Sequence, residues 1–167
     1  MKQDIEKDIW SWIQTYVEAN HEFYDYKFPP CPYAKAARLK GMVNVTAYES
    51  GSISQFIKNS VQSSHNVQVL VLPPKIRWYY HIHWLLKNIN KKLILSDRYV
   101  QYGMAVTTHS KYPGLKGPYF IIIVNVLSDV IAGHNALSFS DYYKGWDKSH
   151  YDNVVLRRNK MIKQHDR

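Results

Sequence analysis

Tyr119-Phe120-Ile121-Ile122-Ile123-Val124 is the most apolar segment of the chain, and it predicts a strand at the centre of a sheet. The preceding residues 107–118 are rich in proline and glycine, which predicts a loop. Residues 99–106 alternate weakly between apolar and polar side chains and predict another strand before that loop. Because the connection is short, these two strands are expected to form an antiparallel pair.

Two further strands and a series of helices are expected in the rest of the chain. Strands are predicted at residues 42–48 and 67–72, the second ending at Pro73-Pro74. Helices are predicted at about 2–20, 33–39, 53–64, 75–90, 127–132 and 147–164, with a helical turn at 140–143 and a short strand or linker at 93–95. This order predicts one α/β domain over residues 1–167. It is an α/β sandwich in which a four-stranded mixed sheet carries helices mainly on one face.

The composition excludes several classes of protein. The chain has 167 residues and a formal net charge of +9, and its 46% hydrophobic residues are too many for a disordered chain. Its single Cys excludes an intramolecular disulfide. It has neither the apolar core of a signal peptide nor the roughly 18 apolar residues of a membrane span, so a soluble cytoplasmic protein is expected.

The excess of basic and aromatic residues has three interpretations. It is typical of a nucleic-acid-binding surface, where cations neutralise phosphates and rings stack on bases. It also suits a pocket for a flat anionic cofactor, with rings on its faces and cations on its carboxylates. The third interpretation is a basic surface over a core with half-buried tyrosines.

Few residues have the spacing of a known site. Cys31 lies in a Pro-Cys-Pro turn before a predicted helix, where a thiolate is favoured and could bind a metal, or where the residue is simply a small buried hydrophobe. His81 and His83 diverge on a helix, which argues against a shared metal site. Gly-rich phosphate loops and a Ser nucleophile elbow are absent, and paired carboxylates are scarce among only 13 Asp and Glu residues. His109 begins the Gly/Pro loop at a strand end, where ligands collect in α/β sheets, or it is a surface histidine.

Three segments together resemble the YqcI/YcgG family. The first is Phe28-Pro29-Pro30-Cys31-Pro32-Tyr33-Ala34-Lys35-Ala36-Ala37, similar to a Phe-Pro-Cys…Ala-Lys-Ala segment near the start of that family. The second joins Tyr102-Gly103-Met104-Ala105-Val106-Thr107-Thr108-His109-Ser110 to the strand at 118–125. The third is the tail Leu156-Arg157-Arg158-Asn159, similar to the family's Ile-Arg-x-Arg-Asp.

The resemblance implies haem binding. The family includes a haem-dependent N-hydroxylase of guanitoxin biosynthesis, so the implied activity is hydroxylation of an amine or guanidine nitrogen of a small molecule. The loop histidine of the family falls on His109, which becomes the expected axial ligand of the haem iron. Further candidates for holding the iron, the ring faces or the propionates are Cys31, Lys35, Arg38, Arg77, Trp78, Trp84 and Arg157. No catalytic residue is assigned, and the sequence has no motif for the electron donor that such a reaction needs.

The alternative hypothesis is a non-enzymatic, basic protein that binds single-stranded nucleic acid. In that case Trp78, Tyr79, Tyr80 and Trp84 stack on bases while Lys and Arg follow the phosphates. A haem protein is coloured, whereas nucleic-acid affinity falls steeply with salt. The aromatic residues stand among apolar residues and prolines rather than between Lys and Arg, which favours the haem hypothesis.

Overall fold

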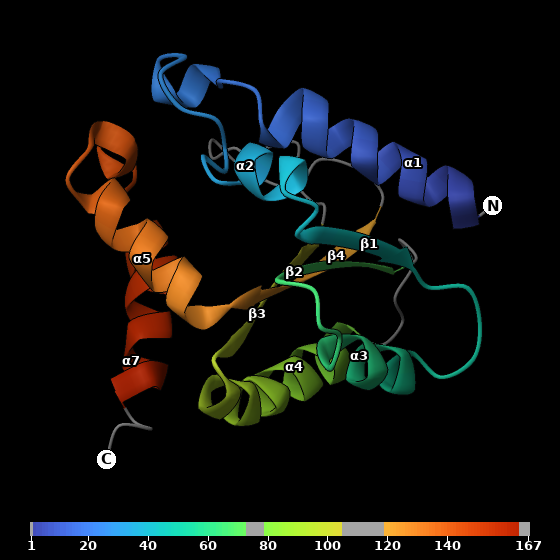
Figure 1. The fold of residues 1–167 in the computed structure, drawn as a ribbon. Coiled ribbons are helices and arrows are strands. Elements are labelled where there is room, and N and C mark those ends of the chain that lie inside the picture. Colours follow the sequence, from blue (N-terminus) through green and yellow to red (C-terminus); the bar gives the residue numbers. More distant parts are fainter. Residues whose placement is uncertain (1, 73–78, 105–118, 164–167) are drawn as a thin grey trace.

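The computed structural model describes residues 2–72, 79–104 and 119–163. They contain a four-stranded mixed sheet with the order β1-β2-β4-β3 (Figure 1). The strands are β1 (Val43–Ala47), β2 (Val67–Leu72), β3 (Arg98–Met104) and β4 (Phe120–Val126). β1 and β2 are parallel, whereas β4 is antiparallel to both β2 and β3. The predicted α/β class, the four strands and the antiparallel last pair are therefore confirmed.

Helices fill the connections between the strands and the end of the chain. They are α1 (Lys2–Trp12), α2 (Ala34–Leu39), α3 (Ile53–Val61), α4 (Tyr79–Leu93), α5 (Leu127–Ser138), α6 (Lys148–Tyr151) and α7 (Arg157–Lys163). Short 3₁₀ or π-helical turns are η1 (Ile13–Val17), η2 (Glu22–Tyr24), η3 (Ile94–Ser96), η4 (Asp141–Tyr143) and η5 (Asp152–Leu156). The segment at 93–95 is thus helical, neither the short strand nor the linker that the sequence predicts.

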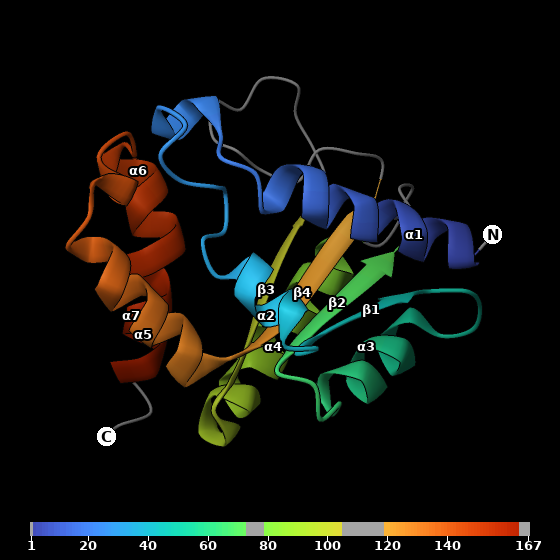
Figure 2. The same ribbon diagram turned by 45° about the horizontal axis from the view of Figure 1, so that its top comes forward.

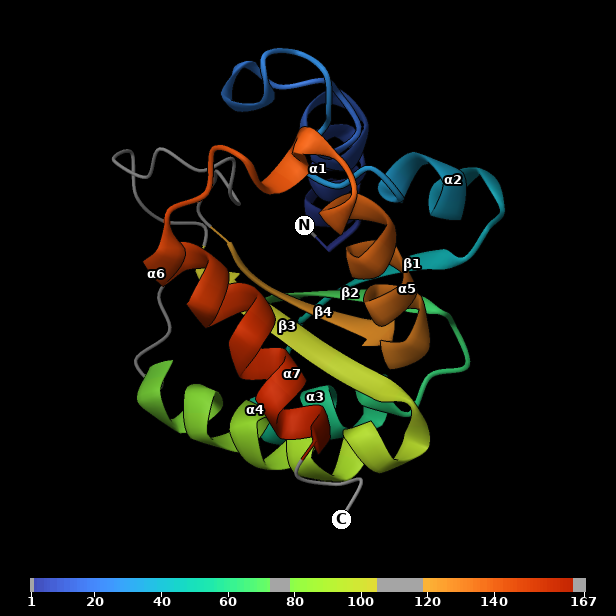
Figure 3. The same ribbon diagram turned by 90° about the vertical axis from the view of Figure 1, so that its left-hand side faces the viewer.

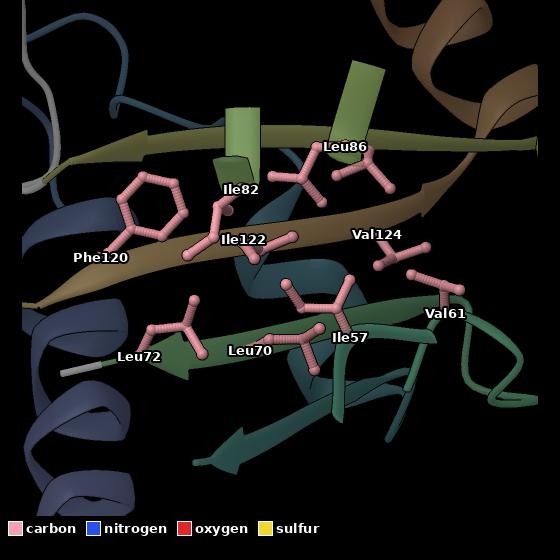
Figure 4. Packing of buried hydrophobic residues seen from close by; sticks show 10 residues of the cluster. Ile57, Val61, Leu70, Leu72, Ile82, Leu86, Phe120, Ile122 and Val124 are labelled. Carbon is pink, nitrogen blue, oxygen red and sulfur yellow. The ribbon is translucent and has the colours of Figure 1, made fainter. Parts of the chain in front are cut away.

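The helices cover both faces of the sheet, not mainly one as the sequence predicts. Leu70 and Leu72 of β2 point toward α3 and α4, where Ile57 and Leu86 are fully buried against them (Figure 4). Val69 and Val71 of the same strand point to the opposite face, which α1 covers (Figure 1). Because the central strands are apolar on both faces, each face needs a helical layer to exclude water.

The edge strand β3 is held by a buried amide of α4. Asn90 donates from Nδ2 to the carbonyl of Val100 at 2.9 Å, and its Oδ1 accepts from the N–H of Val100 at 2.7 Å. These bonds occupy backbone groups on the outer side of an edge strand, which would otherwise be open to another chain. The α4 layer is thereby fixed to β3 from one face of the sheet.

The C-terminal helices form a group beside β3. Asp97, directly before β3, accepts from the N–H of Ser128 at 2.8 Å and from its hydroxyl at 2.6 Å, which fixes the start of α5. Helices α5, α6 and α7 then fold next to one another beyond the strand (Figures 2 and 3). Tyr99 of β3 lies on the face opposite to α4, because its neighbour Val100 faces the α3–α4 layer.

None of the helices in the described part of the chain has the length and apolar character needed to span a bilayer.

Candidate functional site

The Pro-rich turn after η2 packs against η4, more than 100 residues later in the chain. The Tyr142 hydroxyl donates to the carbonyl of Pro30 at 2.6 Å. The Tyr142 ring stacks on that of Tyr24, with centroids 4.6 Å apart and planes 15° from parallel. Phe28 meets Tyr142 edge-on at 5.7 Å. The turn is thereby one wall of an aromatic region whose other wall is the C-terminal group of helices.

Tyr33, directly after the turn, requires a glycine in α5. Its hydroxyl donates to the carbonyl of Gly133 at 3.1 Å. A Cβ atom at position 133 would lie 2.8 Å from Cε2 of the Tyr33 ring, closer than real Cβ contacts. Gly133 costs α5 some helical stability, but it allows the ring to lie directly on the helix backbone.

His134, the next residue of α5, belongs to a group of three rings. Its Nδ1 and the hydroxyl oxygen of Tyr143 share a hydrogen bond of 3.0 Å. The Tyr143 and Tyr151 rings meet edge-to-face at 5.5 Å, and the His134 and Tyr151 centroids are 6.2 Å apart. All three residues are half-buried, so part of each ring is accessible.

Arg158 of α7 is the buried cation of this region. It is 4% exposed, although it stands in the basic tail of the chain. Its Nε and Nη2 atoms both donate to Oδ1 of the neighbouring Asn159, each at 3.3 Å. The structure places no carboxylate of the described residues in an ion pair with it. Tyr99, His134, Tyr143, Tyr151 and Arg158 are called the Arg158 cluster below.

The electrostatics of the Arg158 cluster favour neutral rings around one cation. Burial lowers the pKa of His134, and the nearby Arg158 lowers it further, so the imidazole is neutral at pH 7. Burial raises the pKa of Tyr99, and it raises the pKa of Tyr143 to about 12, against the effect of Arg158. Burial lowers the pKa of Arg158 itself, and the tyrosines Tyr99, Tyr143 and Tyr151 oppose that change. A guanidinium nevertheless stays charged in proteins.

A turn of π-helix arranges the C-terminal residues of this site. The helical run from α6 to α7 begins with Asp147, whose Oδ1 accepts from the N–H of His150 at 2.8 Å. The π-helical turn η5 lies in the middle of the run, between Tyr151 and Arg158. Val155 within this turn is buried. Tyr151 before the turn and Arg158 after it both belong to the Arg158 cluster.

The sequence-predicted residues of the Pro-rich segment do not form one site. Cys31 is exposed as a residue, but burial of its sulfur raises the pKa of the thiol, and the hydrogen bonds from the backbone N–H groups of Tyr33 and Ala34 lower it by less. Lys35 points from the exposed side of α2. Arg38 donates from Nε and Nη2 to the carboxylate of Glu18, at 2.7 and 2.9 Å, and this pairing raises the pKa of Arg38. These two donor groups are therefore already used within the chain.

The remaining candidates are dispersed or fall outside the described residues. Trp84 is exposed on α4, on the far face of the sheet from the Pro-rich turn, and Arg157 is exposed on α7. His81 and His83 lie on α4, as predicted. His109, Arg77 and Trp78 lie outside the described residues.

Within residues 2–72, 79–104 and 119–163, no group of three or more His, Cys, Asp or Glu side chains is arranged to hold a metal ion. Comparisons with protein families, curated proteins and solved structures find no match for this chain.

The sequence analysis missed most of the Arg158 cluster. It identifies the basic tail and selects Arg157, whereas the buried arginine is its neighbour Arg158. The available signal was the spacing of Tyr151, Val155 and Arg158, which recur at four and three residues and so share one helix face. His134 had no such signal, because its partner Tyr143 comes from a separate turn.

Proposed function

We propose that this chain is a small haem-binding protein that oxidises an amine or guanidine nitrogen of a small molecule. One observation carries the proposal: two of the three segments on which the family resemblance rests lie at the same place in the fold. The segment at 28–37 contributes Tyr33, which lies on Gly133 of α5. The segment at 156–159 contributes Arg158, and both Tyr33 and Arg158 influence the hydroxyl of Tyr143.

The residue types of this region fit the needs of a haem. A haem needs a neutral imidazole, aromatic or apolar walls and a cation for a propionate. The resemblance assigns the axial position to His109, which lies outside the described residues. The described residues offer one neutral imidazole, His134, and a buried cation that no described carboxylate neutralises, Arg158. The second segment of the resemblance, which contains His109, lies in the sequence between Met104 at the end of β3 and Phe120 at the start of β4.

A bound haem supplies the oxidising chemistry, and the chain controls what reaches it. Arg158 would hold a carboxylate of the cofactor or of the substrate. The half-buried rings of Tyr143 and Tyr151 would exclude water from that contact. The hydrogen bond between Tyr143 and Nδ1 of His134 joins two neutral groups and would hold the Tyr143 hydroxyl in place beside the bound molecule.

Titration of the purified protein with haemin, followed by absorption spectroscopy, tests the proposal. The wild type is expected to develop a Soret band that saturates at about one equivalent, as one axial site requires. His109→Ala should remove or shift the band, while the matched variant His65→Ala, at an exposed histidine, should keep it. Absence of a band in the wild type contradicts haem binding. A band that His109→Ala leaves intact and His134→Ala removes contradicts the assignment of the axial ligand.

A second candidate function rests on the outer face of α4. Tyr80 is 86% exposed and Trp84 is 63% exposed, and Lys87 and Lys91 are exposed on the same side of the helix. Their spacing of four, three and four residues places these four side chains in one stripe. Rings followed by lysines suit the stacking of unpaired bases with phosphates alongside.

Fluorescence anisotropy with a labelled single-stranded oligonucleotide tests this second candidate. If α4 binds nucleic acid, the affinity falls steeply with salt, and Trp84→Ala weakens it by about tenfold or more. Leu95→Ala, an exposed residue outside the stripe, is the matched control. Salt-independent binding, or equal binding by the wild type and Trp84→Ala, contradicts it.

A further inference from the structure

Arg158 forms no ion pair with any of the residues that the structure describes. Its two hydrogen bonds run from Nε and Nη2 to one neutral amide oxygen, that of Asn159, at the long distance of 3.3 Å. Its Nη1 group has no described acceptor. The residue is nevertheless 4% exposed, so water replaces few of the missing contacts. A guanidinium has five N–H donors, and buried donors are seldom left without acceptors. Another group is therefore expected to accept the remaining hydrogen bonds of Arg158.

Few acidic residues outside the described ranges could pair with Arg158. Of the 13 acidic residues, only Asp166 lies outside the described ranges. The segments 73–78 and 105–118 contain neither Asp nor Glu. Outside the described ranges, the carboxylates that these 167 residues offer are Asp166 and the α-carboxylate of Arg167, and any other counter-charge comes from a group that is not part of them.

The surroundings of Arg158 select the charge of that group. Burial keeps His134 in its neutral form at pH 7, and Tyr99 and Tyr143 stay protonated because burial raises the pKa of each. The Arg158 cluster thus offers one positive charge, which matches a monoanion. A phosphate dianion needs further buried cations, whereas the second cation near the cluster, Arg157, is close enough to lower the pKa of Tyr99 but is exposed, so water and salt screen its charge.

The rings of the Arg158 cluster select the shape of the group. Tyr143 and Tyr151 stand at 87° to each other with centroids 5.5 Å apart, and the His134 plane makes 52° with Tyr151. The half-buried rings of Tyr143 and Tyr151 offer apolar faces, while the Tyr143 hydroxyl is engaged with Nδ1 of His134. Planar guanidinium and planar carboxylate pair through two parallel hydrogen bonds, and a flat apolar body suits the ring faces.

We propose that the Arg158 cluster is a binding site for the carboxylate of a flat, aromatic or conjugated small molecule. Arg158 pairs with the carboxylate, Tyr143 and Tyr151 border its body, and the His134–Tyr143 hydrogen bond fixes the position of the Tyr143 hydroxyl. This inference goes beyond the proposed function, because it requires no iron and applies to a cofactor, a substrate or a regulator that carries such a carboxylate.

The test is a titration of the haem-free protein with benzoate as the probe, followed by thermal unfolding and by calorimetry. Sodium chloride at equal ionic strength corrects for salt effects, and acetate and inorganic phosphate are the comparison anions. The melting temperature of the wild type should rise saturably with benzoate, less with acetate and least with phosphate. Arg158→Met should weaken benzoate binding by at least about tenfold, since it removes a charge-assisted pair. Lys160→Met removes an exposed charge from the same helix and should change binding by less than about twofold.

Several results would overturn the proposal. The proposal is wrong if benzoate does not bind to the wild type. It is also wrong if Arg158→Met binds benzoate as tightly as the wild type does. Phosphate binding more tightly than benzoate overturns the choice of a carboxylate. If Asp166→Asn, or removal of residues 164–167, raises the benzoate affinity, a carboxylate of this segment is the natural counter-charge of Arg158, and the proposal that a separate ligand supplies it is overturned. Arg158→Lys keeps the charge but cannot form the two parallel hydrogen bonds of a guanidinium. Its benzoate affinity, which should also be lower than that of the wild type, provides a second measurement if Arg158→Met fails to fold.

The outcome is separable from that of the haem titration. Benzoate binding without a Soret band supports the carboxylate site and contradicts the proposed haem function. A Soret band that depends on His109, together with no response to benzoate, supports haem binding and overturns this inference.

Discussion

Replacing Arg158 by methionine should stabilise the ligand-free protein. Arg158 is buried, its only described hydrogen bonds are two long ones to Asn159, and it has no ion pair with a described residue. Replacing buried ion pairs by apolar side chains is often neutral or stabilising by about 1–4 kcal/mol, because the desolvation of the charges is no longer required. The guanidinium of Arg158 lacks even the partner that offsets this cost. We therefore expect the free energy of unfolding of Arg158→Met to rise by roughly 1–3 kcal/mol, with an increase in melting temperature of roughly 2–4 °C per kcal/mol.

Urea denaturation followed by circular dichroism measures this change. The buffer is Tris with sodium chloride, free of carboxylates and phosphate, so that no anion stabilises the wild type. Lys160→Met is the matched control and should change the free energy of unfolding by less than about 0.5 kcal/mol, since its side chain is exposed. A loss of about 2 kcal/mol or more in Arg158→Met would refute the reasoning, because it means that the guanidinium has a stabilising partner within the folded chain.

Three further changes test the packing and the titration that the structure describes. Gly133→Ala places a Cβ 2.8 Å from the Tyr33 ring, so we expect a net loss of about 1 kcal/mol in urea denaturation despite the better helix propensity of alanine; a gain would show that the ring moves freely. Leu86→Ala empties a fully buried position and should cost about 2–5 kcal/mol, whereas Leu95→Ala, at a residue that is 70% exposed, should cost less than about 0.5 kcal/mol; equal losses contradict the assigned core. Burial lowers the pKa of His134 in the folded state, so the unfolded state binds more protons at low pH, and the stabilisation present above pH 6.5 is lost as the pH falls below it. His134→Gln should flatten this part of the stability profile measured by denaturation at several pH values, and an unchanged slope contradicts the assignment.

The strands of the sheet could be predicted from the sequence because their pattern is local. Residues 67–72 form a strand with the predicted limits, since the apolar run stops at two prolines. The strand predicted from residue 119 begins at Phe120 and extends to Val126. The distribution of helices over the two faces could not be read in the same way. It depends on which helix covers Val69 and Val71, and that is decided by tertiary packing rather than by periodicity.

The candidate site could be predicted only in part, because its residues come from distant segments. The Pro-rich turn and the basic tail were both identified from the sequence, and the structure brings them to one region through Tyr33 and Arg158. The choice of Arg157 rather than Arg158 was not decidable from adjacent arginines alone. The spacing of Tyr151, Val155 and Arg158 at four and three residues was the signal that favours Arg158 as the inward-facing residue.

Two of the places where the described aromatic residues gather bear on the two candidate functions. One is the region between the Pro-rich turn and η4, where Tyr24, Phe28 and Tyr142 pack against one another. The other is the exposed face of α4, with Tyr80 and Trp84. The two lie on opposite faces of the sheet, so the haem proposal and the nucleic-acid proposal concern different surfaces and can be tested with separate variants.

The central claim is that the Arg158 cluster receives a ligand, and the side-chain Nε–H resonance of Arg158 tests it most directly. In protein labelled with ¹⁵N-arginine, the resonance is assigned by its absence from the Arg158→Met spectrum. We expect this resonance to shift saturably when benzoate is added, whereas the resonance of Arg157 should stay in place and equal sodium chloride should have no effect. An Arg158 resonance that is unmoved by benzoate, or that moves equally with sodium chloride, would contradict the claim.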